Sequence, residues 1–213
     1  MAACTSQPPD QKQSQSVPES STPVLGSASY LTANSFADLA ERSTIIAIGR
    51  VIQTENIINM ARDADDPMKD DDRVFGVGQV YQFHIDRYLK GAEEDVIHIV
   101  QPEGFIGQGM SKTEEDIERA KINYDYIPLS MDKNYLMFLH PMFDPPDLGY
   151  YVGVAHPWRF DLSDPRRVIP ESPWGFASMV FPPQSLEFII QQIEHPESFP
   201  PTPPPEPITS PYP

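Results

Sequence analysis

The stretch RVFGVGQVYQFHIDRYLKG, residues 73–91, alternates between apolar and polar side chains over most of its length. Because successive side chains of a β-strand point to opposite faces, the pattern predicts a long strand with one dry face. Gly76 and Gly78 indicate a bend or bulge within it, as a strand needs in order to curve around a small barrel. The dry face consists of Phe75, Val77, Tyr81, Phe83, Ile85 and Leu89, and the opposite face of Gln82, His84 and Asp86.

Further strands are predicted on both sides of this one. TIIAIGRVIQ (44–53) is largely apolar on both alternating faces, which is typical of a buried strand. DVIHIVQ (95–101) follows a turn at Lys90-Gly91 and predicts a third strand. NYLMFLHPM (134–142) adds another, and GYYVGVAHPWRFDL (149–162) one or two more.

Three segments carry helix signals. Ser35, with Asp38 three residues later, is the expected N-cap of a helix in NSFADLAERS. Ser111 and Glu114 form a capping-box signal for a second helix in SKTEEDIERAK. The third helix follows Pro182-Pro183, and its apolar stripe consists of Leu186, Ile189, Ile190 and Ile193.

This order of elements predicts a mainly β domain with flanking helices. Three strands, a helix after the third strand, two or more further strands and a C-terminal helix follow the order of the OB-fold, a five-stranded Greek-key barrel. A β-sandwich is the main alternative. We place the single domain at residues 30–194, after a Ser-, Gln- and Pro-rich disordered tether (1–29) and before a proline-rich disordered tail (195–213). The tail contains P-x-x-P spacing, which suits a stiff spacer or a ligand for a proline-reading domain.

The composition excludes several classes of protein. A formal net charge of −16 argues against nucleic-acid binding and against direct docking on anionic lipid. With only one cysteine, the chain has neither a disulfide framework nor a thiolate metal site. Its apolar runs are too short to span a bilayer.

Five segments in order resemble a set of bacterial extracytoplasmic proteins of undefined function: TIIAIGRVI, YQFHIDRYLKG, VIHIVQPEG, IPLSMDKNYLMFL and GYYVGVAHPWRFDL. The match spans about residues 36–162. The domain of those proteins is similar to the netrin-like OB barrel of the tissue inhibitors of metalloproteinases. Those inhibitors chelate the protease zinc through an N-terminal cysteine that disulfides hold in place. Because this chain has no second cysteine, the resemblance implies the barrel and not the inhibition.

The N-terminal Ala2-Ala3-Cys4 resembles the end of a bacterial lipobox, with Met1 where a leucine would stand. The resemblance implies cleavage before Cys4 and a lipid on its sulfur, and therefore an extracytoplasmic protein anchored to the cell membrane. The charged and apolar parts of the secretion signal would lie upstream, so we expect the chain to lack them. The alternative is a cytosolic protein with a chance cysteine in a disordered leader.

An acidic loop is the candidate cation site. Carboxylate oxygens are the ligands that Ca²⁺ prefers. The EF-hand template fails here, because Met68 and Val74 occupy its glycine and glutamate positions. A solvated loop without an ion is the alternative. The carboxylates are those of Asp63, Asp65, Asp66, Asp70, Asp71 and Asp72.

Histidines and aromatic residues provide candidates for partner binding. His84 and Asp86 on the second strand, with His98 on the third, predict a polar cluster on the outer surface, although a purely structural role fits them as well. In the C-terminal third, Tyr150, Tyr151, Trp158 and Trp174 could stack on sugar rings, with core packing as the alternative. We select His84, Asp86, Tyr151 and Trp158 as the partner-binding candidates. Arg159, Arg166 and Arg167 form the one basic cluster.

No catalytic motif is present: G-x-S-x-G, H-E-x-x-H and the Walker spacing are all missing. We therefore expect a lipid-anchored binding or structural protein and no enzyme, with no cofactor beyond a candidate Ca²⁺ ion. Its expected partners are the membrane, through Cys4, and a cell-wall glycan or a basic protein. The alternatives are a glycan-binding module that uses the C-terminal aromatic residues, a protease-inhibitor-like domain, and a carboxylate-dependent hydrolase.

Overall fold

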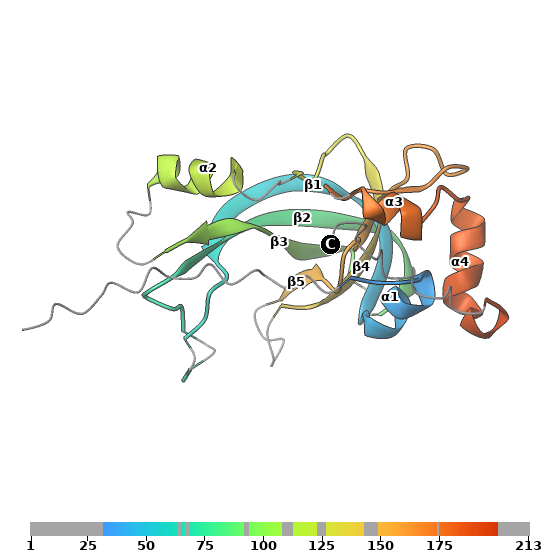
Figure 1. The fold of residues 1–213 in the computed structure, drawn as a ribbon, viewed down its shortest axis with the longest axis horizontal. Helices are drawn as coiled ribbons and strands as arrows, with labels where there is room; N and C mark the ends of the chain where they lie inside the picture. Colours follow the sequence, from blue (N-terminus) through green and yellow to red (C-terminus); the bar gives the residue numbers. More distant parts are fainter. Residues whose placement is uncertain are drawn as a thin grey trace, which may run out of the picture.

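The computed structural model describes residues 32–63, 65–66, 69–91, 94–107, 113–122, 127–142, 149–173 and 175–199. In this part the chain is mainly β, as predicted, with helices at both ends of the sheet (Figure 1). Cys4 and the predicted tether lie outside the described residues, as do Trp174 and Ser111.

The strands of the described part belong to one hydrogen-bonded sheet. They are β1 (Ile45–Asn59), β2 (Phe75–Lys90), β3 (Val96–Ile106), β4 (Asn134–Pro141), β5 (Tyr150–Gly153), β6 (Arg159–Asp161) and β7 (Ile169–Pro170).

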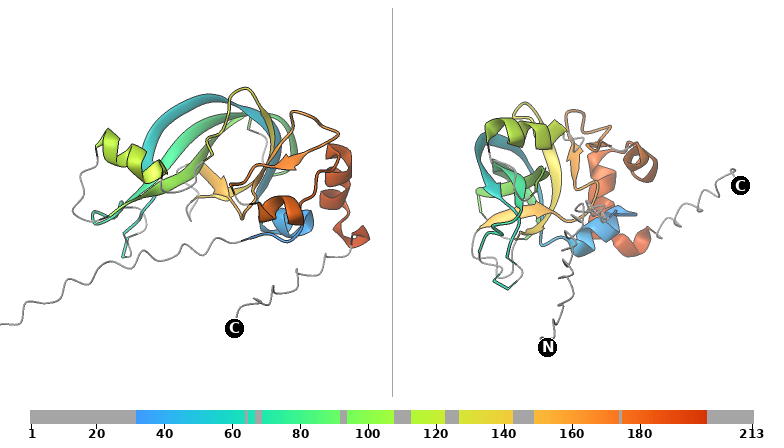
Figure 2. Two further views of the ribbon diagram at one scale, coloured as in Figure 1. Left: turned by 45° about the horizontal axis from the view of Figure 1, so that its top comes forward. Right: turned by 60° about the vertical axis from the view of Figure 1, so that its left-hand side comes forward.

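The strand pairings form a ring with an extension. They run β1–β2–β3–β5–β4 and return to β1, while β6 and β7 continue the sheet from β4. The three longest strands curve strongly along their length (Figures 1 and 2). The ring is uneven, because β1 and β2 pair over most of their length whereas β3 and β5 share two residue pairs and run parallel.

The helices lie at opposite ends of the sheet. One helix stands at the end where β3 finishes, and the other three gather at the far end (Figures 1 and 2). The helices are α1 (Phe36–Arg42), α2 (Glu114–Ile122), α3 (Phe176–Val180) and α4 (Leu186–Glu194).

The N-caps of α1 and α2 can be compared directly with the caps that the sequence predicted. Ser35 caps α1 as predicted, because its side chain accepts a hydrogen bond from the backbone N–H of Asp38. Ser111 of the predicted capping box lies outside the described residues; at the start of α2 the Thr113 hydroxyl accepts from the N–H of Asp116 and donates to its carboxylate. A 3₁₀ turn at Pro196–Ser198 follows α4, so ordered structure extends past the predicted boundary at Glu194.

Two apolar cores lie on opposite faces of the sheet. Alternate residues of β4 enter different cores, Met137 the strand core and Phe138 the helix-covered core. This arrangement explains why the segments around β1 and β4 are apolar on both faces. The strand core contains Ile45, Ala47, Val51, Tyr81, Phe83, Ile85, Ile97, Ile99, Leu129, Tyr135, Met137, Leu139 and Trp158. The helix-covered core contains Ala33, Phe36, Leu39, Ile46, Leu136, Phe138, Val154, Ala155, Phe160, Leu162, Val168, Phe181 and Ile189.

Bulges interrupt the long strands. The register of β2 against β3 shifts between Val77 and Gly78, where the glycine pattern predicted an irregularity, and the extra residue is Glu103. A second shift places Asp86 in a bulge opposite Gly49. A Cβ atom on Gly49 would lie 2.0 Å from the carbonyl oxygen of His84, so this close approach of β1 and β2 requires glycine.

Candidate functional site

A row of polar side chains crosses the strands on the face of the sheet opposite the strand core, and we call it the polar face. Register pairs Arg50 with His84, Gln82 with His98, and His98 with Tyr150, so the row runs from β1 to β5. It consists of Arg50, Glu55, Gln82, His84, Asp86, His98 and Tyr150.

The carboxylate of Glu55 organises one half of the polar face. The Gln82 side-chain amide donates to Glu55 Oε1, and Nε2 of His98 lies 3.6 Å from Glu55 Oε2. The ring of Tyr150 meets the His98 ring edge to face, with centroids 6.0 Å apart. Register shifts between Thr54 and Ile57 place Glu55 in a bulge of β1, which directs its side chain toward β2 and β3.

The carboxylate of Asp86 organises the other half of the polar face. Its Oδ1 lies 3.3 Å from Nδ1 of His84 and 3.5 Å from Nη1 of Arg50. The ionisable side chains of the polar face are between 26% and 50% exposed. They therefore pair with one another and still present donors and acceptors to solvent.

The four predicted partner-binding residues do not form one site. His84 and Asp86 lie together on the polar face. Tyr151 is half-buried against the strand core, and burial raises the pKa of its hydroxyl. Trp158 is only 6% exposed and belongs to the strand core, where its ring packs directly over the backbone of Gly153. This position favours the core-packing alternative for Trp158.

In the acidic loop between β1 and β2, most of the carboxylates contact other residues of the same loop. Asp70 pairs with Arg62, Asp66 with Lys69, and Asp71 with Arg73. Hydrogen bonds from the side chain and backbone of Arg73 hold the pKa of Asp71 below its ordinary value. The carboxylate of Asp63 accepts from the backbone N–H groups of Asp65 and Asp66, and Asp72 is exposed. Within the described residues, no group of three or more His, Cys, Asp or Glu side chains is arranged to hold a metal ion.

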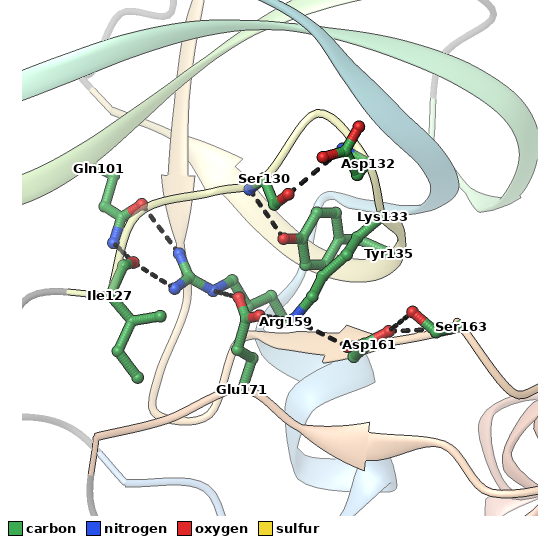
Figure 3. Close-up of polar contacts among 10 residues, drawn as sticks. All are labelled: Gln101, Ile127, Ser130, Asp132, Lys133, Tyr135, Arg159, Asp161, Ser163 and Glu171. Carbon is green, nitrogen blue, oxygen red and sulfur yellow. Dashed lines mark hydrogen bonds and ion pairs between the residues drawn. The ribbon is translucent and has the colours of Figure 1, made fainter.

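A buried ionic network lies at the end of the strand core (Figure 3). Arg159 is 2% exposed, and its Nη1 donates to Gln101 Oε1 at 2.8 Å while its Nη2 donates to the Ile127 carbonyl. Its Nε lies 2.9 Å from Glu171 Oε2. Lys133 Nζ donates to the other Glu171 oxygen at 2.7 Å.

Lys133 extends the network to Asp161, whose Oδ2 lies 2.9 Å from Nζ. Hydrogen bonds to Glu171 and Asp161 raise the pKa of Lys133. Burial alone would raise the pKa of Asp161, but hydrogen bonds from Ser163 and Lys133 outweigh it and lower that pKa. The network therefore ties the segment before β4 to β6 and to the residue after β7.

Arg159 consequently does not belong to the predicted basic cluster with Arg166 and Arg167. It is buried, whereas those two residues are exposed. Sequence reasoning also missed Lys133 and Glu171, whose partners are far away in the sequence. The available signal was an arginine between the aromatic residues Trp158 and Phe160 in an apolar strand, a position where a buried charge requires a partner.

A second buried ion pair fixes α2 to the sheet. Glu103, the bulge residue of β3, is fully buried, and its Oε2 lies 3.1 Å from Nζ of Lys121. Burial alone would lower the pKa of Lys121, but hydrogen bonds with Glu118 and Glu103 outweigh it and raise that pKa. The bulge thus serves to attach the helix.

No family model, curated protein or solved structure matches the chain. Among the described residues, none of the helices has the length and apolar character that crossing a membrane requires.

Proposed function

We propose that this protein is a lipid-anchored extracytoplasmic binding protein built on an OB-like barrel, and that its polar face binds a cell-wall glycan. The observation that carries the proposal is the polar face itself, a solvent-facing row of amide, imidazole and carboxylate groups that crosses β1, β2, β3 and β5.

The strand order supports an OB-like barrel. A ring β1–β2–β3–β5–β4, with β3 parallel to β5 and a helix between β3 and β4, is the connectivity expected of a five-stranded Greek-key barrel. In that fold, oligosaccharides and oligonucleotides bind over strands 2 and 3. The polar face occupies these strands.

The chemistry of the polar face favours a glycan over the other expected partners. Sugar hydroxyl groups need neighbouring donors and acceptors, which Gln82, His98 and Glu55 supply within one patch. Tyr150 adds an aromatic ring beside them. A basic protein would require free carboxylates, but those of Asp66, Asp70 and Asp71 in the adjacent loop already have basic partners.

Titration of the protein with solubilised cell-wall fragments tests the glycan proposal. Gln82→Ala and His98→Ala should each weaken binding at least about fivefold, because each removes one hydrogen-bonding group. Gln192→Ala and His195→Ala, on and after α4, remove the same side-chain types far from the polar face and serve as matched controls. Equal losses in both pairs, or no binding by the unaltered protein, would contradict the proposal.

The anchor needs a separate experiment. Cells that produce the protein with an upstream secretion signal should incorporate a radioactive fatty acid into it, and Cys4→Ala should abolish both labelling and membrane fractionation. An unlabelled protein, or a Cys4→Ala variant that still fractionates with membranes, would contradict lipid attachment while leaving the glycan proposal intact.

A further inference from the structure

A groove of about 590 Å³ lies along α4 and shares no residue with the polar face. This volume is within the range typical of ligand sites. One side of the groove is the helix, and the other is formed by the turn before β7 and by the end of β2. It is lined by Arg87, Pro165, Arg166, Ser185, Leu186, Glu187, Ile190, Gln191 and Glu194.

Two arginines in this groove lack the ion pairs that most basic residues of the described part form. Most lysines and arginines of the described part form ion pairs, as expected when acidic residues outnumber basic ones by 31 to 15. Arg87 and Arg166 form no ion pair with any described residue, although both are exposed and line the same groove. The arginine fork binds carboxylates bidentately, so two such groups in a concave site favour an anionic ligand.

The rest of the lining restricts the ligand further. Leu186, Ile190 and Pro165 supply apolar contacts along the groove. Glu187 and Glu194 lie near the two ends of the helix. They would repel a ligand that carries acidic groups along its whole length. α4 has nine residues, about 13 Å of helix, which matches about four residues of extended peptide.

We propose that this groove binds an extended segment of a partner protein in which one Asp or Glu residue is flanked by apolar side chains. The carboxylate lies against Arg87 and Arg166, and the flanking side chains lie against Leu186 and Ile190. A flat anionic bilayer fits the site less well, because the arginines line a concave surface and both glutamates would face the lipid phosphates. The site shares no residue with the polar face and does not involve the lipid on Cys4.

NMR titration of the 213-residue chain tests the proposal. The probe is a pool of hexapeptides with a central Asp or Glu and flanking positions randomised among Ala, Val, Leu and Ile; the matched pool carries Asn or Gln at the centre. We expect the acidic pool to shift the Nε–Hε signals of Arg87 and Arg166, and the amide pool to bind at least about tenfold more weakly.

Variants and competing anions complete the test. Arg87→Ala and Arg166→Ala should each reduce binding at least about tenfold, whereas Arg167→Ala, next to the groove but not lining it, should retain it. Since Arg87 and Arg166 are exposed, the variants should unfold at the wild-type temperature. Equal binding of the two pools, or unchanged binding by both arginine variants, would overturn the proposal. So would inorganic phosphate shifting both arginines at the same concentration as the peptides, or arginine-dependent sedimentation with phosphatidylglycerol vesicles.

Discussion

The first strand of the sheet passes through two environments. Near its start, Ile46 lies beneath the helices at one end of the sheet, and Ala47 enters the strand core on the opposite face. Farther along, Gln53 is exposed and the Glu55 side chain is 26% exposed. Burial on two sides makes the first half a structural element, and burial on one side leaves the second half free to carry polar groups. Substitutions should therefore affect stability at the covered end and binding at the open end.

Phe138→Ala should have the largest effect. The Phe138 ring is fully buried between the sheet and the helices, with the Phe36 and Phe160 ring centroids 6.1 Å and 5.8 Å away. Its removal leaves a cavity and should lower the free energy of unfolding by about 3–5 kcal/mol. Urea unfolding measures this value. A loss below about 1 kcal/mol would mean that the helices do not pack on β4 as described.

Arg159→Ala should have the next largest effect and lower the free energy of unfolding by about 3 kcal/mol, because it leaves the Glu171 carboxylate, which is only 12% exposed, with Lys133 as its ionic partner. The exposed Arg50 pairs with Asp86, and Arg50→Ala should cost less than about 1 kcal/mol. Chemical unfolding of both variants compares a buried and an exposed ion pair in one sheet. Similar losses would place Arg159 in contact with solvent.

Lowering the pH should destabilise the end of the sheet that the helices cover. Burial, helped by the charge of Arg159, lowers the pKa of His156 from 6.5 to about 4. Between these two values the unfolded chain binds more protons than the folded chain, so stability is present above pH 6.5 and is lost as the pH falls toward 4. The loss should be on the order of 3 kcal/mol.

Thermal unfolding of the wild type and of His156→Gln across this pH range checks the assignment. The variant should lose the part of the slope between pH 6.5 and 4 that His156 contributes, because glutamine does not titrate; His140, whose pKa burial also lowers, contributes in the same direction. An unchanged slope would assign the pH dependence to other groups.

The smallest effects on stability belong to the polar face. Gln82→Ala should change the free energy of unfolding by less than about 0.5–1 kcal/mol, because its amide is partly exposed and the backbone pairing of β2 is unaffected. The same variant should show the fivefold loss of glycan binding. A large loss of stability here would remove the contrast between the two ends of the sheet.

Periodicity explains most of what the sequence predicted. Two apolar faces in TIIAIGRVIQ indicated a buried strand, and the register shift beside Gly78 occurs where the glycines indicated it. Local signals also identified the Ser35 cap. The long-range pairs could not be predicted, because nothing in the sequence around Arg159 specifies that Glu171 and Gln101 will contact it. For the same reason, the burial of Trp158 and the grouping of Glu55 with Gln82 and His98 depended on the tertiary fold.

Two of the margins of the described sheet contain a proline. β3 continues past its pairing with β5 at Ile99, and Pro102 lies in that unpaired stretch beside the Glu103 bulge. At the other margin, β7 is two residues long and ends at Pro170. A proline offers no N–H group to an incoming strand, and a bulge or a short strand gives a poor template. These two margins are therefore poor templates for joining other copies edge to edge, which leaves β1 beyond Arg50, paired with β2 alone among the described strands, as the margin where such joining would begin.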